Sequence, residues 1–126
     1  MDSPEDLRAE LAQFTTPTAH LWVNATWPWL KYSDGVQAFA EHAGSGGYWV
    51  LDAIGRRAHD AAKLNHRLHI TLTVLNGTAW LTATDGATQA PQIKPLRVPR
   101  VDCPEGDWHF ILEDGGDYIL MLPTEL

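Results

Sequence analysis

The sequence predicts an α+β fold, with three N-terminal helices packed on a mainly antiparallel sheet of four or five strands. Apolar residues recur every three or four positions before residue 65, as in amphipathic helices, and at every second position in residues 68–75, as in a strand. A chain of 126 residues that is 44% apolar is also long enough to bury one core. We therefore expect a single domain over residues 1–126, with a helical part at about 3–64 and a sheet part at about 66–123.

The helical part begins with a capping pattern. Ser3 stands where an N-cap is expected, and Pro4 occupies the first helical position. A glycine-rich segment at residues 44–47 separates two further helical patterns, and Pro28 biases Trp27 toward extended chain. We expect helices at residues 5–14, from Ser33 or Asp34 to Ala43, and at about 48–63, with irregular chain at 21–32.

The clearest strand signal is a hairpin around Asn76-Gly77, a dipeptide typical of a type I′ turn. A two-residue loop fixes the register, so that Val74 faces Ala79 and Thr73 faces Trp80. One face of this hairpin is then aliphatic. The other face carries His69, Thr71, Thr73, Trp80, Thr82 and Thr84.

A second hairpin is predicted from residues 108–113 and 118–122, around Asp114-Gly115-Gly116-Asp117. Both of its strands are apolar on nearly every residue, which is typical of strands in the middle of a sheet that is covered on both faces. Three prolines within residues 89–99 limit that segment to a short edge strand. Much of the core is expected from Leu51, Ile54, Leu68, Ile70, Leu72, Val74, Leu81, Phe110, Leu112, Leu120 and Leu122.

Charge and composition argue against several classes of function. A net charge of −7 and a pI near 5.1 disfavour direct nucleic-acid binding and fit a basic protein partner. No apolar run approaches the roughly 20 residues that span a bilayer, so no membrane association is expected. One cysteine, together with an N-terminus that lacks signal-peptide features, predicts a cytoplasmic protein.

Catalytic and metal-binding patterns are weak. The sharpest metal pattern, His66-x-x-His69, places its two rings on opposite faces of a strand, so we expect neither a metal site nor a cofactor. An enzyme would need an active site assembled from residues distant in sequence. The set that we consider for this alternative is His69, His109, Asp52 and Cys103.

Tryptophan is the most informative residue type, with six in the chain and three within residues 22–29. Trp80 stands among Thr71, Thr73 and His69, where an exposed face would form a binding platform, because aromatic residues dominate interface hot spots. The alternative is that a helix or another segment covers this face. Trp22, Trp27 and Trp29 are expected either to bind a partner or to line a ligand pocket against the sheet.

Several segments resemble the DUF6876 family of small bacterial proteins. They are Glu10-Leu11-Ala12-Gln13-Phe14-Thr15, Ser33-Asp34-Gly35-Val36, Tyr48-Trp49-Val50-Leu51-Asp52-Ala53-Ile54 and Met121-Leu122-Pro123-Thr124-Glu125. The resemblance runs from about residue 10 to residue 125. It implies the same helix and strand order, transfers no reaction, and suggests a product of a plasmid, phage or other mobile element.

We therefore expect a non-enzymatic accessory protein of a mobile element that binds a protein partner. An acidic surface suits a basic target, such as a host protein that handles nucleic acid, which the chain would inhibit by charge mimicry. One alternative is a small-molecule or peptide binder with an aromatic pocket, and another is the dispersed enzyme described above. A homodimer, formed through an edge strand or the Trp80 face, is a further option.

Overall fold

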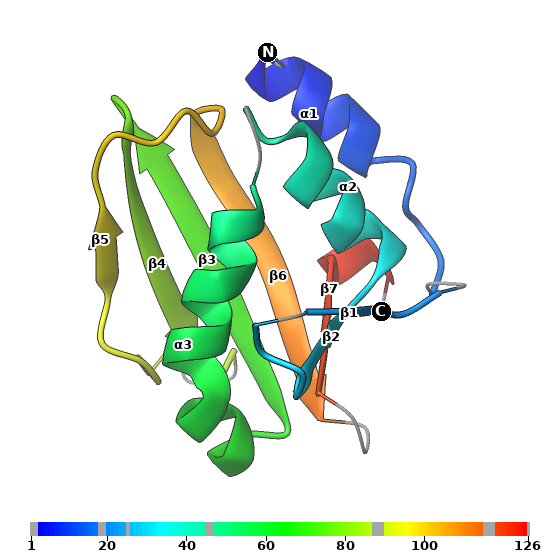
Figure 1. The fold of residues 1–126 in the computed structure, drawn as a ribbon, viewed down its shortest axis with the longest axis vertical. Coiled ribbons are helices and arrows are strands. Elements are labelled where there is room, and N and C mark those ends of the chain that lie inside the picture. The colour runs from blue at the N-terminus through cyan, green and yellow to red at the C-terminus, as the bar shows by residue number, and fades with distance from the viewer. Residues whose placement is uncertain are drawn as a thin grey trace.

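The computed structural model describes residues 3–17, 20–24, 26–44, 47–86, 90–114 and 118–125. These residues form a seven-stranded sheet with the strand order β1-β2-β7-β6-β3-β4-β5. Helices α2 and α3 lie in front of the sheet in Figure 1. The elements are α1 (Pro4–Leu11), β1 (Trp22–Val23), β2 (Leu30–Tyr32), α2 (Asp34–His42), α3 (Tyr48–Leu64), β3 (Arg67–Leu75), β4 (Thr78–Thr84), β5 (Leu96–Val98), β6 (Gly106–Asp114), β7 (Tyr118–Met121) and the 3-10 helix η1 (Pro123–Glu125).

The α+β class is confirmed, but three details of the prediction were wrong. The sheet has seven strands rather than four or five, although it is mainly antiparallel as predicted, with one parallel pairing, between β2 and β7. The helices are not one N-terminal block, since two strands separate α1 from α2 and η1 follows β7. The segment at residues 21–32 was expected to be irregular, yet it contains β1 and β2. Such short strands leave no alternation to detect, so only tertiary pairing reveals them.

The predicted helix caps are present. The Ser3 hydroxyl accepts a hydrogen bond from the Asp6 amide at 3.2 Å, and the Ser33 hydroxyl accepts one from the Val36 amide at 3.2 Å. Helix α1 ends at Leu11, three residues earlier than expected, and α3 closely matches its prediction. The expected glycine-rich stop at residues 44–47 lies partly outside the described residues, as does the turn at 114–117.

The hairpin of β3 and β4 has the predicted register throughout. Asn76 and Gly77 both have positive φ angles, 51° and 75°, as a type I′ turn requires. Strand β5 is a short edge strand, as its prolines predicted. Strands β6 and β7 are internal, but α2 and α3 cover only one face of them, so the expectation of cover on both faces was wrong for the described helices.

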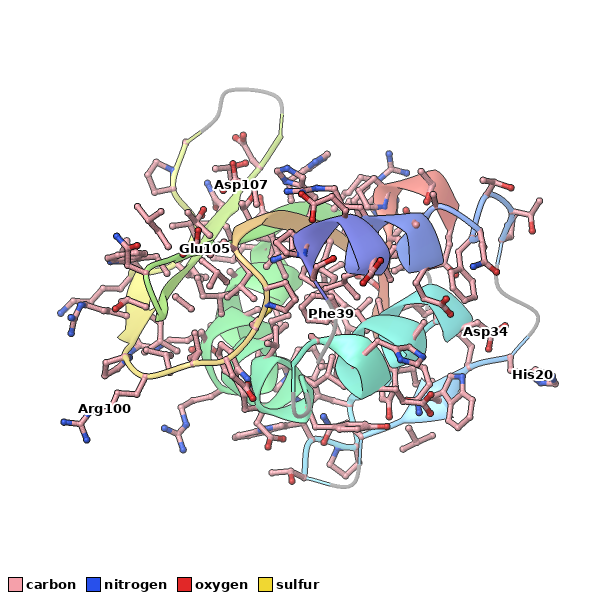
Figure 2. The ribbon with its side chains drawn as sticks, turned by 90° about the horizontal axis from the view of Figure 1, so that it is seen from above. His20, Asp34, Phe39, Arg100, Glu105 and Asp107 are labelled. Carbon is pink, nitrogen blue, oxygen red and sulfur yellow. The ribbon has the colours of Figure 1, made fainter. Side chains whose placement is uncertain are left out.

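The core lies between α2, α3 and one face of the sheet. Phe39 of α2 is fully buried there, packed edge-on against Phe110 at a centroid distance of 5.0 Å. Figure 2 shows Phe39 in the interior between helix and sheet. All eleven predicted core residues named above are buried.

Candidate functional site

One face of the sheet points away from α2 and α3, and we call it the open face. Directly paired residues share a face, so Trp80 lies in a row between Thr73 and Arg97, with Asp107 beyond Thr73. Trp80 remains 36% exposed. The alternative that a helix covers Trp80 is therefore wrong for the helices that the structure describes.

The open face also carries both His69 and His109. They lie on neighbouring strands, offset by two residues, and His109 Nδ1 is 3.2 Å from the Thr71 hydroxyl. Asp107 accepts a hydrogen bond from the Thr73 hydroxyl at 2.8 Å. Threonine and histidine side chains thus form a hydrogen-bonded polar surface on β3 and β6.

The proposed dispersed active site is not assembled. Asp52 is exposed on α3, which packs on the opposite face of the sheet from His69 and His109. Cys103 is 4% exposed, and burial, followed by the nearby Asp102 carboxylate, raises the pKa of Cys103 to about 12. Such a thiol stays protonated at neutral pH and is a poor nucleophile.

The balance of charge differs between the open face and the helices α1 and α2. The open face carries Arg97 as well as Asp107, and Arg67 is paired with Glu113 at 2.9 Å. Helices α1 and α2 instead present a predominance of carboxylates, whereas α3 carries Arg56, Arg57 and Lys63 against Asp52 and Asp60. The carboxylates of α1 and α2 belong to Glu5, Asp6, Glu10, Asp34 and Glu41. A basic partner is therefore better matched by α1 and α2 than by the open face.

At one end of the helical side, aromatic rings are held beside carboxylates. The Trp22 indole N–H donates to Asp34 Oδ1 at 3.0 Å. The Gln37 amide donates both to Glu41 Oε1 and to the Tyr48 hydroxyl, each at 2.8 Å. Trp22 is 42% exposed and Tyr48 46% exposed. We call this set the β1–α2 surface, and it comprises Trp22, Asp34, Gln37, Glu41 and Tyr48.

Further apolar exposure adjoins this surface. Leu21 and Val23, the chain neighbours of Trp22, are 43% and 59% exposed, and Val23 pairs with Lys31 on the open face. Beneath the surface, burial raises the pKa of Tyr32, and the neighbouring Tyr48 and Glu41 raise it further. The sequence analysis selected Trp22 but missed Gln37, Glu41 and Tyr48. The sequence feature that could have identified them is the i,i+4 spacing of Gln37 and Glu41, which lie off the apolar stripe of α2.

The other two tryptophans of the N-terminal group are half-buried. Asn24 accepts hydrogen bonds from the amides of Thr26 and Trp27, which fixes the loop between β1 and β2. Trp29 stacks on His59 of α3 with a centroid distance of 4.4 Å and meets Tyr118 edge-on. Trp29 is therefore a packing residue.

Trp27 instead forms one wall of a groove. Its ring lies so close to Gly55 that a Cβ built there would be 2.4 Å from the indole. The groove, about 340 Å³ in volume, lies among the β1–β2 loop, α3 and β5. Its lining residues are Thr26, Trp27, Trp49, Asp52, Ala53, Arg56, Leu96 and Val98.

Within the described ranges, no three His, Cys, Asp or Glu side chains are grouped so that they could hold a metal ion. His66 lies in a bend just before β3, and His69 lies within that strand. Among the helices described, none has the length and apolar character needed to cross a membrane.

Comparison with known proteins bears on the family. The Family of unknown function (DUF6876) matches residues 5–126. The chain belongs to this family. Two of the segments that carry the DUF6876 resemblance meet in space, because Glu125 near the C-terminus hydrogen-bonds to Ser33 and Gly35 at the start of α2. No curated protein and no solved structure matches the chain.

Proposed function

We propose that this DUF6876 protein is a non-enzymatic accessory protein that binds a basic protein partner through the β1–α2 surface. The observation that carries the proposal is the pair of exposed aromatic rings, Trp22 and Tyr48, fixed by hydrogen bonds beside Asp34 and Glu41. Aromatic anchors are enriched at interface hot spots, and their fixed position lowers the entropic cost of binding.

Charge favours a basic occupant. Asp34 and Glu41 lie on one flank of α2. Oε1 of Glu10, on α1, is 3.9 Å from Nε2 of His42, which is also on α2. A partner with lysine or arginine side chains would be steered to this side of the molecule. Proteins that handle nucleic acid present such surfaces, since they must neutralise phosphates. We extend the proposal to a host protein of this class, inhibited by a cytoplasmic product of a mobile element.

The experiment is affinity purification of the tagged chain from its native host at low salt, followed by direct binding measurements with the purified partner. We expect a stoichiometric basic protein whose affinity falls as ionic strength rises. The double variant Trp22→Ala/Tyr48→Ala should weaken binding by about 100-fold, because two hot-spot aromatics are lost.

Trp80→Ala is the matched control, because it removes a tryptophan of similar exposure from the opposite side of the molecule. It should leave affinity unchanged. If Trp80→Ala fails to bind the partner and the Trp22→Ala/Tyr48→Ala variant still binds it, the interface lies on the open face instead. Recovery of the protein alone at low salt would contradict the proposal as a whole.

A second candidate function, binding of a small molecule or peptide, is favoured by the groove between Trp27 and Trp49. Asp52 and Arg56 stand one helical turn apart at its rim, with apolar Leu96 and Val98 opposite. This lining suits a planar apolar group that carries both a hydrogen-bond donor and an acceptor.

A thermal-shift screen with a library of aromatic amino acids, their derivatives and short peptides tests this candidate. A ligand should raise the melting temperature of the wild type and of Trp80→Ala, but not that of Trp49→Leu. If no compound shifts the wild type, or if all three proteins respond equally, the groove is not a binding site for this class.

A further inference from the structure

Strand β7 ends before its partner β6 does. Strand β6 has nine residues, but β7 pairs only with its second half, from Ile111 to Asp114. If the register continued, Pro123 would stand opposite His109, and proline has no N–H to donate. The chain turns instead into η1, so no described strand pairs with the first half of β6 on this side.

The direction of the β6 backbone groups follows from one hydrogen bond. The Asp114 amide donates to the His66 carbonyl at 3.0 Å, so the even-numbered residues of β6 bond toward β3. The odd-numbered residues bond toward β7. Ile111 and Glu113 have partners there, whereas the backbone N–H and C=O groups of Asp107 and His109 have none among the described residues.

These free groups open on an apolar groove of about 230 Å³. Leu11 of α1 and its C-cap residue Ala12 line one side, Trp108 and His109 the other, and Leu122 and Pro123 the end. Arg8 lies at the same groove, with its guanidinium carbon 4.9 Å from the centroid of the Trp108 ring. Arg8 makes no ion pair with any carboxylate in the part of the chain that the structure describes.

We propose that an extended segment of a partner protein binds in this groove by adding to the free edge of β6. Its backbone would pair with the N–H and C=O groups of Asp107 and His109, as in strand addition. Because side chains alternate along a strand, one apolar side chain would enter the groove beside Leu11 and Leu122. A carboxylate of the segment would complement the unpaired charge of Arg8.

This site goes beyond the proposed function, since it uses different residues and a different recognition mode. In Figure 2, Asp107 and Asp34 lie well apart, on either side of α1. Loss of binding at one site therefore leaves the other measurable.

Amide hydrogen exchange of the full chain is the first test. In the free protein, the amides of Asp107 and His109 should exchange much faster than those of Trp108 and Phe110, which bond to β3. Slow exchange at Asp107 and His109 in the free protein would mean that the edge is already covered, and this would overturn the proposal.

Selection from a phage-displayed library of random heptapeptides is the second test. Enriched peptides should be apolar at one position with a nearby carboxylate, and a synthetic copy should slow the exchange of Asp107 and His109. His109→Pro should weaken binding about five- to tenfold through the lost N–H. It removes no bond to β3, because this N–H points the other way. His109→Ala, which keeps the N–H, should bind as the wild type does.

Ala12→Trp provides a variant that leaves β6 untouched and fills the groove, and it should abolish peptide binding. Two results would refute strand addition. One is that no peptide is enriched on the wild type over Ala12→Trp. The other is that selected peptides bind His109→Pro and Ala12→Trp as tightly as the wild type.

Discussion

The Ser33 hydroxyl donates a hydrogen bond of 2.5 Å to Glu125 Oε1, joining residues 92 positions apart. The same carboxylate accepts from the Gly35 amide at 3.1 Å and from the Leu122 amide at 2.9 Å. Glu125 is 3% exposed. A carboxylate at this position satisfies the free Gly35 amide at the start of α2 and lies where the helix dipole favours an acidic group. The contact fixes η1 against α2 and so holds the C-terminal segment on the fold.

Glu125→Ala should therefore destabilise the protein by about 2–3 kcal/mol, because buried amides and a hydroxyl lose their acceptor. Denaturant unfolding measures this change. Asp60→Ala, which removes an exposed carboxylate from α3, should change stability by less than about 0.5 kcal/mol. Equal midpoints for wild type and Glu125→Ala would show that the carboxylate is not a structural support.

Gly55→Ala should displace Trp27. Alanine in place of glycine ordinarily stabilises a helix interior by up to about 1 kcal/mol. Here the new Cβ would lie 2.4 Å from the indole, so the ring must move or the helix must shift. We expect the indole N–H resonance of Trp27 to shift strongly in NMR spectra, with unfolding stability unchanged or lowered. A more stable variant with an unmoved resonance would contradict the packing described.

Cys103 should make the protein less stable in alkali. Its pKa is raised from 9.0 to about 12 in the folded state, so between these values the unfolded state releases the proton and the folded state keeps it. The contribution of the protonated Cys103 thiol to the free energy of unfolding is fully present below pH 9. It falls as pH rises toward 12, by at most about 1.4 kcal/mol per pH unit. The stability of Cys103→Ala should decline less over this window. A thiol reagent should label Cys103 only after unfolding, and rapid labelling of native protein would refute its burial.

Gly77→Ala should weaken the β3–β4 hairpin. Gly77 has a φ of +75°, and a Cβ there would meet only the Val101 carbonyl oxygen at 3.7 Å, so the cost is conformational rather than steric. A destabilisation of about 1 kcal/mol is expected from the left-handed backbone. Gly77→Asn should cost less, because asparagine tolerates this conformation. The two variants are compared by thermal unfolding, and equal losses would indicate a different turn.

Signals that lie within a few residues of one another were sufficient to predict much of the fold. Serine caps located the starts of α1 and α2, and Asn76-Gly77 fixed every pairing between β3 and β4. Alternation then assigned Trp80 and its threonine neighbours to the face opposite the aliphatic core. These features depend on backbone preferences and on periodicity, which act locally.

The site could be predicted only in part, because its residues converge from distant segments. Sequence drew attention to Trp22 and Trp80 but could not place Trp22 beside Asp34, since that contact depends on β1 pairing with β2. It also could not separate Trp27, which lines a groove, from Trp29, which packs on His59. Both tryptophans flank the same proline.

By itself, then, the sequence determined the α+β class, the helices, the central hairpins and the apolar core. Hydrophobic periodicity and helix capping depend only on residues that are close in sequence. Only the tertiary structure decided that the sheet has seven strands with one parallel pairing, that the described helices leave one face of it uncovered, and that Glu125 binds the start of α2. The physical reason is that strands of two or three residues gain their stability from partners far along the chain. Burial, pairing and the direction of free backbone groups likewise exist only once those partners meet.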